Sequence, residues 1–207
     1  MARVAKEKSA DRKRPLQERA QVTLDSIVES AERILQTKGY ASLTTNHIAE
    51  VAGVSIGTLY HYFPNKDMIV QALIEDRVTR ASAQLRSRLL DLMGEPIAVM
   101  FPAMIRELLS VYREYEFVLL RLPNEMPRLE DQQSRLTTEH FTFSTNLNYL
   151  KQHTTELSVE DLELALFLMD NAITSNCIQF LTRGLPETSE ASFVDELSGM
   201  MVRYLTK

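Results

Sequence analysis

Apolar residues in the first part of the chain recur every three or four positions, the repeat of an amphipathic helix. Over residues 16–38 this repeat consists of Leu24, Ile27, Val28, Ala31, Ile34 and Leu35. Gly39 closes the predicted helix, because glycine readily adopts the left-handed conformation in which helices end. Residues 1–15 are polar and lack any such repeat, so they are predicted to form a flexible basic arm.

The following stretch predicts two short helices joined by a tight turn. Thr44 or Thr45 can cap the first helix, because a hydroxyl there accepts a hydrogen bond from an otherwise unpaired backbone N–H. Gly53 permits the left-handed turn that ends it. Ser55 can cap the second helix, and Pro64 stops it, since the residue before a proline is disfavoured in the helical region. This order of caps and stops is that of a helix-turn-helix, whose second helix enters the major groove of DNA.

The second of these helices has an apolar side and a polar side. Leu59 and Phe63 are four residues apart, so they share the side that faces the first helix. The opposite side carries small or hydrogen-bonding residues, namely Gly57, Thr58 and His61, flanked by Tyr60 and Tyr62. A glycine lets the helix backbone approach another surface closely, and hydroxyl and imidazole groups suit phosphates and base edges. This side is therefore predicted to face DNA.

The rest of the chain continues the helical repeat without any β pattern. Helices are predicted over 66–92, 97–115, 128–152, 162–181 and 190–205, with a short apolar segment at 117–122. Pro102 either kinks a helix or starts a new one, and Ser158 with Asp161 resembles a capping box. The predicted fold class is all-α, with a helix-turn-helix DNA-binding domain over 16–66 and a helical effector-binding and dimerisation domain over 67–207.

Composition and charge fit this division. The chain has 207 residues, 44% of them hydrophobic and 25% charged, and only six are glycine, which favours helices. Residues 1–66 hold ten Lys and Arg against seven Asp and Glu, whereas residues 67–207 hold thirteen against twenty-one. A basic head on an acidic body favours a polyanionic partner. No uninterrupted apolar run approaches the about 20 residues of a membrane span, so no membrane contact is predicted.

Motifs for catalysis or metal binding are absent from the sequence. There is no glycine-rich phosphate loop, no His-Glu-x-x-His and no nucleophile elbow. The histidines His47, His61, His140 and His153 are scattered, and none pairs with Cys177 at a useful helical spacing. The single cysteine excludes an internal disulfide and fits a reducing cytoplasm. No cofactor or metal is predicted, and an enzyme on a helical scaffold is the weaker alternative.

One run of residues is specific enough to indicate a family. It consists of Thr44, Thr45, Ile48, Ala49, Ala52, Gly53, Val54, Ser55, Gly57, Thr58, Leu59, Tyr60, Phe63, Asn65 and Lys66. With this continuous spacing, about residues 23–73 resemble the DNA-binding domain of the tetracycline-repressor (TetR) family of bacterial regulators; the rest resembles the family in length and helical pattern. The resemblance implies a homodimeric repressor, with its dimer interface near 162–181 and 190–205, released from a palindromic operator by a small molecule. An effector-free architectural DNA-binding protein is the alternative.

The predicted DNA-binding residues lie on and around the two short helices. They are Thr44, Thr45, Asn46, Ser55, Ile56, Gly57, Thr58, Tyr60, His61, Tyr62 and Lys66. Thr44, Thr45, Tyr60 and Lys66 suit phosphate contacts, and an Asn46 amide can pair with adenine. Ile56 either meets a thymine methyl or simply packs. Long polar readers are few, so phosphate contacts and DNA shape are expected to carry much of the specificity.

The predicted effector-binding residues are mostly bulky apolar residues of the second domain, where a helical bundle also needs most such residues as core. They are Met100, Phe101, Met104, Phe117, Arg121, His140, Phe141 and Phe167. Arg121 lies in an apolar run, so it needs a partner if buried, or else it reaches solvent or a nearby glutamate. A ligand wedged here would tilt the helix over 66–92 and change the separation of the two recognition helices in the dimer.

Overall fold

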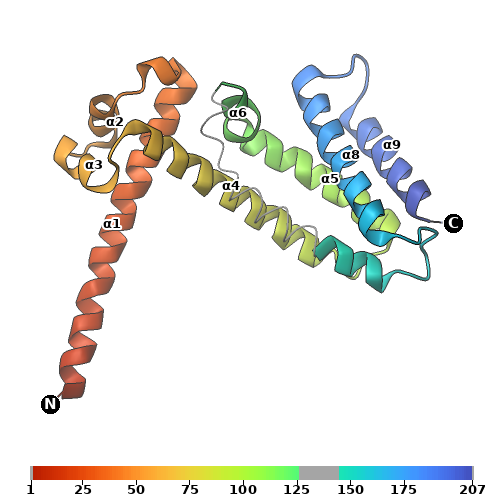
Figure 1. The fold of residues 1–207 in the computed structure, drawn as a ribbon, viewed down its shortest axis with the longest axis horizontal. Helices are drawn as coiled ribbons and strands as arrows, with labels where there is room; N and C mark the ends of the chain where they lie inside the picture. The colour runs from red at the N-terminus through yellow and green to blue at the C-terminus, as the bar shows by residue number, and fades with distance from the viewer. Residues whose placement is uncertain (1, 126–144, 207) are drawn as a thin grey trace. The chain divides into compact units, whose positions relative to one another are not determined.

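A computed structural model describes residues 2–125 and 145–206, with the side chains of 19–123 and 145–206. Within these ranges the regular elements are helices, and the one β-type feature is an isolated bridge between Leu157 and Thr206 (Figure 1). The predicted all-α fold class is therefore confirmed. The chain divides into two compact units, Met1–Asp76 and Arg77–Lys207, so the division falls inside a helix rather than after residue 66.

The first unit holds the helix-turn-helix stretch. Its elements are α1 (Ala2–Lys38), the 3₁₀ turn η1 (Tyr40–Ser42), α2 (Thr45–Ala52), α3 (Ile56–Tyr62) and the start of α4 (Lys66–Asp91). Its fully buried side chains include Ile27, Ala31, Leu43, Ile48, Leu59, Ile69 and Leu73. The apolar repeat of α1 thus faces α2, and Ser26 donates a hydrogen bond to the Ala52 carbonyl at 3.1 Å. This bond ties α1 to the end of α2.

The beginning of α1 differs from the prediction. Residues 2–15, predicted to be a flexible arm, continue α1 as helix back to Ala2. Apolar periodicity reveals a helix only where one side of the helix carries the apolar repeat, so a helical stretch without that repeat gives no such signal. The residue types of this stretch, mainly Ala, Lys, Arg and Glu without glycine, favour helix, and Pro15 is its only strong helix breaker.

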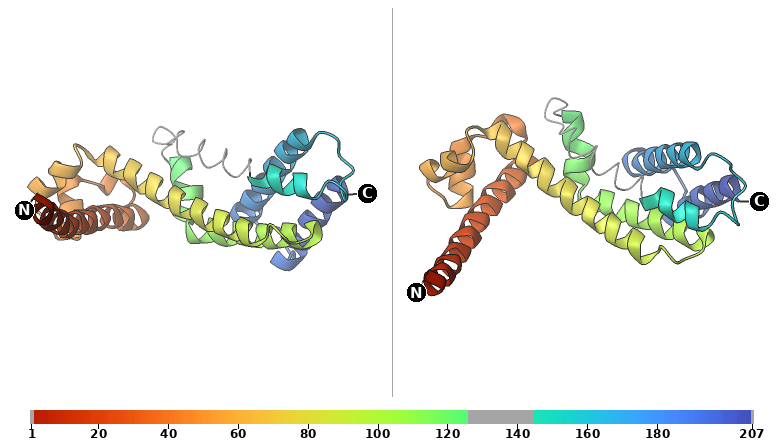
Figure 2. Two further views of the ribbon diagram at one scale, coloured as in Figure 1. Left: turned by 90° about the horizontal axis from the view of Figure 1, so that it is seen from below. Right: turned by 60° about the horizontal axis from the view of Figure 1, so that its bottom comes forward.

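The second unit is built around three helices. After the C-terminal part of α4 come α5 (Ile97–Glu114), the π-helical turn η2 (Phe117–Arg121), α6 (Leu122–Glu125), a helix over 145–152, α8 (Leu162–Arg183) and α9 (Glu190–Leu205). Figures 1 and 2 show α5, α8 and α9 packed together. Ile105, Tyr149, Cys177 and Val194 are completely buried in their shared core. Pro102 lies inside α5, which is one helix rather than two.

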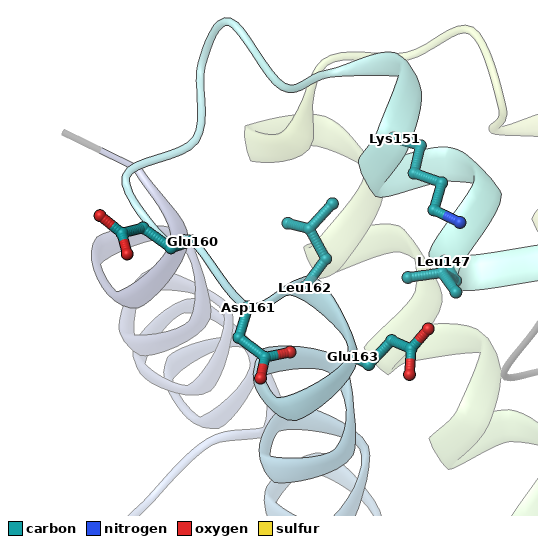
Figure 3. Close-up of a pocket in the computed structure, with 6 residues that line it drawn as sticks. All are labelled: Leu147, Lys151, Glu160, Asp161, Leu162 and Glu163. Atoms are coloured by element: carbon teal, nitrogen blue, oxygen red, sulfur yellow. The ribbon is translucent and has the colours of Figure 1, made fainter.

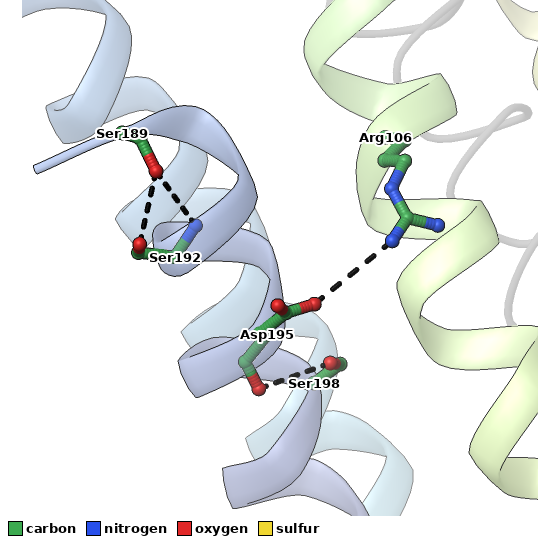
Figure 4. Close-up of polar contacts among 5 residues, drawn as sticks. All are labelled: Arg106, Ser189, Ser192, Asp195 and Ser198. Atoms are coloured by element: carbon green, nitrogen blue, oxygen red, sulfur yellow. Dashed lines mark hydrogen bonds and ion pairs between the residues drawn. The ribbon is translucent and has the colours of Figure 1, made fainter.

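Polar contacts fix α9 against α5. Figure 4 shows Arg106 of α5 reaching toward Asp195 of α9, with 3.9 Å between the guanidinium nitrogen and the carboxylate oxygen. Arg113 pairs in the same way with Glu190. Ser189 caps α9 by accepting a hydrogen bond from the Ser192 N–H at 3.1 Å. Because the ion pairs are largely exposed, they contribute little free energy and mainly define how α9 lies along α5.

The start of α8 corrects the predicted capping box. The cap is Asp161, whose carboxylate accepts a hydrogen bond from the Leu164 N–H at 3.0 Å. Ser158 instead donates its hydroxyl to the Leu205 carbonyl at 3.1 Å, while its own N–H bonds the same carbonyl at 2.7 Å. Ser158 therefore anchors the segment before α8 to the end of α9. Spacing alone cannot distinguish this distant acceptor from a local one.

Candidate nucleic-acid interface

The turn between α2 and α3 has the local geometry that the sequence predicts. Thr44 caps α2 by accepting a hydrogen bond from the His47 N–H at 3.2 Å, which decides between the two candidate caps. Gly53 ends α2 with a φ of 67°, in the left-handed region. The Val54 N–H then bonds the Ala49 carbonyl at 3.0 Å, closing a Schellman-type turn. These short-range bonds fix where α3 begins.

Helix α3 is anchored on one side and exposed on the other. Ser55 caps it by accepting a hydrogen bond from the Thr58 N–H at 3.0 Å. Leu59 is completely buried and Phe63 nearly so, as their shared side predicts. The other side carries the exposed Gly57, Tyr60 and His61, the half-buried Thr58 and Tyr62, and Ile56 with 39% of its surface exposed. The side predicted to face DNA is therefore open to solvent.

Side chains from α2 and α3 meet at this open side. The Thr45 hydroxyl lies 3.1 Å from the Tyr60 hydroxyl, so two residues predicted to contact phosphate are adjacent although they are 15 positions apart. Asn46 is exposed in the first turn of α2. The hydroxyls of Ser55 and Thr58 are 2.8 Å apart and bond each other. A hydroxyl that donates within such a pair still has a lone pair to accept a bond.

Lys66 is the first residue of α4, where Asn65 caps the helix by accepting a hydrogen bond from the Met68 N–H at 3.0 Å. The Lys66 ammonium lies 3.9 Å from the centre of the Tyr40 ring. The Tyr40 hydroxyl donates a hydrogen bond to the Asp67 carboxylate. Burial, followed by this bond, raises the pKa of Tyr40 to about 12, so its hydroxyl keeps its proton at neutral pH.

Tyr40 is absent from the predicted site residues. Its partner Asp67 is 27 positions away, and no periodic or motif spacing connects residues that far apart. The one clue in the sequence is the preceding glycine, Gly39, which indicates a turn. In the structure Gly39 has a φ of 72°, and the chain turns there into η1, which carries Tyr40.

Gly57 has no structural requirement for glycine. Its φ lies outside the left-handed region, and a Cβ at this position would meet only the Ser55 hydroxyl, at 3.8 Å. That is an ordinary van der Waals distance. The exposed space beside Gly57 is therefore left open by the protein itself.

The predicted effector-binding residues do not all come together. Met100 and Phe101 are buried in the core of the second unit, with Met104 packed against it, and Phe117 is buried in η2. Arg121 is exposed, with its guanidinium 5.6 Å from the centre of the Phe117 ring, and Phe167 is 58% exposed on α8. His140 and Phe141 lie outside the described residues.

A surface hollow of about 490 Å³ lies elsewhere in the second unit (Figure 3). It is lined by Leu147 and Lys151 of the helix over 145–152 and by Glu160, Asp161, Leu162 and Glu163 at the start of α8. None of the predicted effector-binding residues lines it. It is wide open to solvent and mixed in charge, and Asp161 is already used as a helix cap.

Helix α8 carries large apolar side chains that its own chain leaves exposed, among them Leu164, Phe167 and Leu168. By length and composition alone, Leu162–Arg183 is long and apolar enough to cross a membrane: an 18-residue window in it has a mean hydropathy of 1.2, and 22% of that window is buried within the chain. Among the described residues, no group of three or more His, Cys, Asp or Glu side chains could hold a metal ion.

Comparison with known proteins gives consistent results. A family model described as bacterial regulatory proteins, tetR family, matches residues 27–73. The HTH-type transcriptional regulator TtgR of Pseudomonas putida is 43% identical over 75 residues, which are 33% of this chain and 36% of TtgR. The chain therefore spans about a third of the length of that relative.

Two solved structures share the fold over most of the chain. A TetR family transcription regulator from Marinobacter aquaeolei VT8 has a TM-score of 0.63 and 15% identity, covering 92% of this chain and 99% of that one. RolR in complex with resorcinol has a TM-score of 0.53 and 18% identity, covering 91% and 90%.

Proposed function

Because this chain belongs to the TetR family of bacterial regulators, we propose that it is a cytoplasmic, homodimeric repressor that binds a palindromic operator and leaves it when a small molecule binds. The observation that carries the DNA-binding part is the exposed side of α3. Leu59 and Phe63 are buried and anchor α3, so this side of the helix faces solvent, and the space beside Gly57 is open. Small and hydrogen-bonding groups on an exposed recognition helix suit base edges and phosphates.

The residues divide into two proposed roles. Tyr60 and Lys66 bind phosphates, whereas Asn46 and Thr58 read bases. Genome-wide mapping of bound sites identifies the operator, and fluorescence anisotropy then compares operator with random duplex. Tyr60→Phe and Lys66→Ala weaken both duplexes alike, while Asn46→Ala or Thr58→Ala lowers specific binding by about 1–3 kcal/mol per lost base contact. Equal losses on both duplexes for all four variants would refute the assignment.

The proposed dimer rests on the exposed apolar side chains of α8 and α9. Leu164, Phe167 and Leu168 on α8 are about half exposed, as are Met200 and Tyr204 on α9. Apolar surface of this extent is normally covered by a partner. A second copy is the occupant we propose, because a two-fold dimer presents two recognition helices to a palindrome. A monomer in sedimentation at micromolar concentration, with and without DNA, would refute it.

The proposed effector is a small, largely apolar molecule that enters between Met100, Phe101, Met104 and Phe117. Support comes from RolR, a protein of the same fold whose structure holds resorcinol. Helix α4 contributes residues to both units, and in the second unit Gln84 bonds Glu107 of α5 at 2.9 Å. A ligand that displaces α5 would therefore pull on α4, whose first turn directly follows α3.

This coupling must be reciprocal. If the effector weakens operator binding, operator DNA weakens effector binding by the same factor, corresponding typically to about 1–3 kcal/mol. A thermal-shift screen identifies a ligand, and titration calorimetry measures its affinity with and without operator. Equal affinities for a ligand bound in the second unit would refute induction.

One observation favours an effector-free DNA-binding protein instead. Met100 and Phe101 are packed in the core rather than facing a cavity, so a ligand must open that core before it can bind. A screen that finds no ligand, combined with operator binding that small molecules leave unchanged, would support this second candidate.

A further inference from the structure

Lys66 occupies a position where a lysine is electrostatically unfavourable. It is the first residue of α4, and the N-terminus of a helix carries a partial positive charge. A long, flexible lysine would ordinarily extend into solvent there. Lys66 is instead only half exposed, and its ammonium sits over the face of Tyr40, 3.9 Å from the ring centre. At this distance the cation is attracted by the electron-rich face of the ring.

The Tyr40 ring is itself held in place. It belongs to η1, and its hydroxyl donates to Asp67, the residue next to Lys66. The ring is therefore fixed through its backbone at one end and through Asp67 at the other. Asp67 also lies in the first turn of α4, where a negative charge is favourable. Lys66 is itself the first residue of α4, and the N-terminal N–H groups of a helix also favour anions.

We propose that Tyr40 is a positioning residue for DNA binding: it holds the Lys66 ammonium ready for a backbone phosphate without touching DNA. This inference rests on the proposed function. A lysine that is already ordered loses less side-chain entropy when it binds phosphate. Removing the ring leaves the charge in the molecule but releases it into solvent.

The test is a double-mutant cycle on operator binding. Tyr40→Leu is expected to weaken binding about 2- to 5-fold per protomer, the size of an exposed cation–aromatic contact. Tyr40→Phe, the conservative variant, loses the bond to Asp67 but keeps the aromatic face that attracts the ammonium and the backbone of η1 that carries it, so it is expected to bind within about twofold of the unchanged protein. In a Lys66→Ala background, Tyr40→Leu is expected to have no further effect. An equal loss in both backgrounds would mean that Tyr40 acts through folding alone, and would overturn the proposal.

A second measurement works without DNA. Dimethylation of lysines with ¹³C-labelled formaldehyde keeps their positive charge, and a methyl group held over an aromatic face has an upfield NMR shift. We expect this shift at Lys66 in the unchanged protein and in Tyr40→Phe, but not in Tyr40→Leu. A Lys66 signal at the solvent-exposed position in the unchanged protein overturns the proposal. Failure to bind any duplex despite a shifted signal would refute the proposed function but leave the Tyr40–Lys66 arrangement intact.

Discussion

Gly57→Ala separates the requirements of folding from those of DNA binding. Gly57 lies in the first turn of α3, on the exposed side of the helix. The added methyl group has room, because its nearest neighbour within the protein would be the Ser55 hydroxyl at 3.8 Å. The substitution therefore introduces neither a clash nor backbone strain.

The expected effect on stability is favourable. Alanine in a helix is more stable than glycine by about 0.5–1 kcal/mol, because glycine loses more backbone entropy on folding. For a chain of this length such a gain corresponds to a rise in Tm of about 1–4 °C.

The expected effect on operator binding has the opposite sign. If the α3 backbone approaches DNA at Gly57, a methyl group there pushes the helix out of the groove and removes a base contact. One lost contact costs about 1–3 kcal/mol, or about 5- to 150-fold in affinity per protomer. Calorimetric unfolding measures the stability, and fluorescence anisotropy with labelled operator measures the affinity.

Gly94→Ala is the matched control. Gly94 also has no left-handed φ, and an added methyl group there would have no neighbour within 4 Å, but it lies in the turn after α4, in the second unit. It is expected to leave operator affinity unchanged. A Gly57→Ala protein that is more stable and binds operator normally would refute the close approach. A Gly57→Ala protein that is less stable than the unchanged protein would show that folding itself requires glycine here, contrary to the open space beside Gly57.

Three other outcomes are expected. Lys66→Ala lowers the slope of log affinity against log salt concentration by about 1 per protomer, whereas Asn46→Ala leaves this slope unchanged and alters base preference. Anisotropy titrations at several salt concentrations measure the slope for each variant. Phe167→Glu shifts the sedimentation profile from dimer to monomer, while the equally apolar and exposed Leu90→Glu on α4 does not. Burial raises the pKa of Cys177 from 9.0 to about 12. The contribution of the protonated thiol to the free energy of unfolding is therefore complete below pH 9 and declines as the pH rises from 9 toward 12. At pH 8 the thiol is expected to react with Ellman's reagent only after unfolding, and rapid reaction of the folded protein would contradict this.

The amino-acid sequence by itself determined the local architecture of the helix-turn-helix. Thr44, Gly53 and Ser55 each act on backbone groups within a few positions, so their roles follow from spacing and residue type. Leu59 and Phe63 were predictable for a similar reason, since a helical repeat specifies which residues share a side. The prediction of a helix-turn-helix followed from these local features, and the family was indicated by their resemblance to its DNA-binding domain.

Only the tertiary structure decided the contacts between residues distant in the chain. Ser158 bonds the end of α9 rather than capping α8, and Tyr40 meets Lys66 and Asp67, because folding brings together groups that no periodic spacing relates. Phe167 is exposed on α8 although its residue type predicts burial. Hydrophobicity favours the removal of a side chain from water, but whether its own chain or a second molecule covers it depends on how the helices pack.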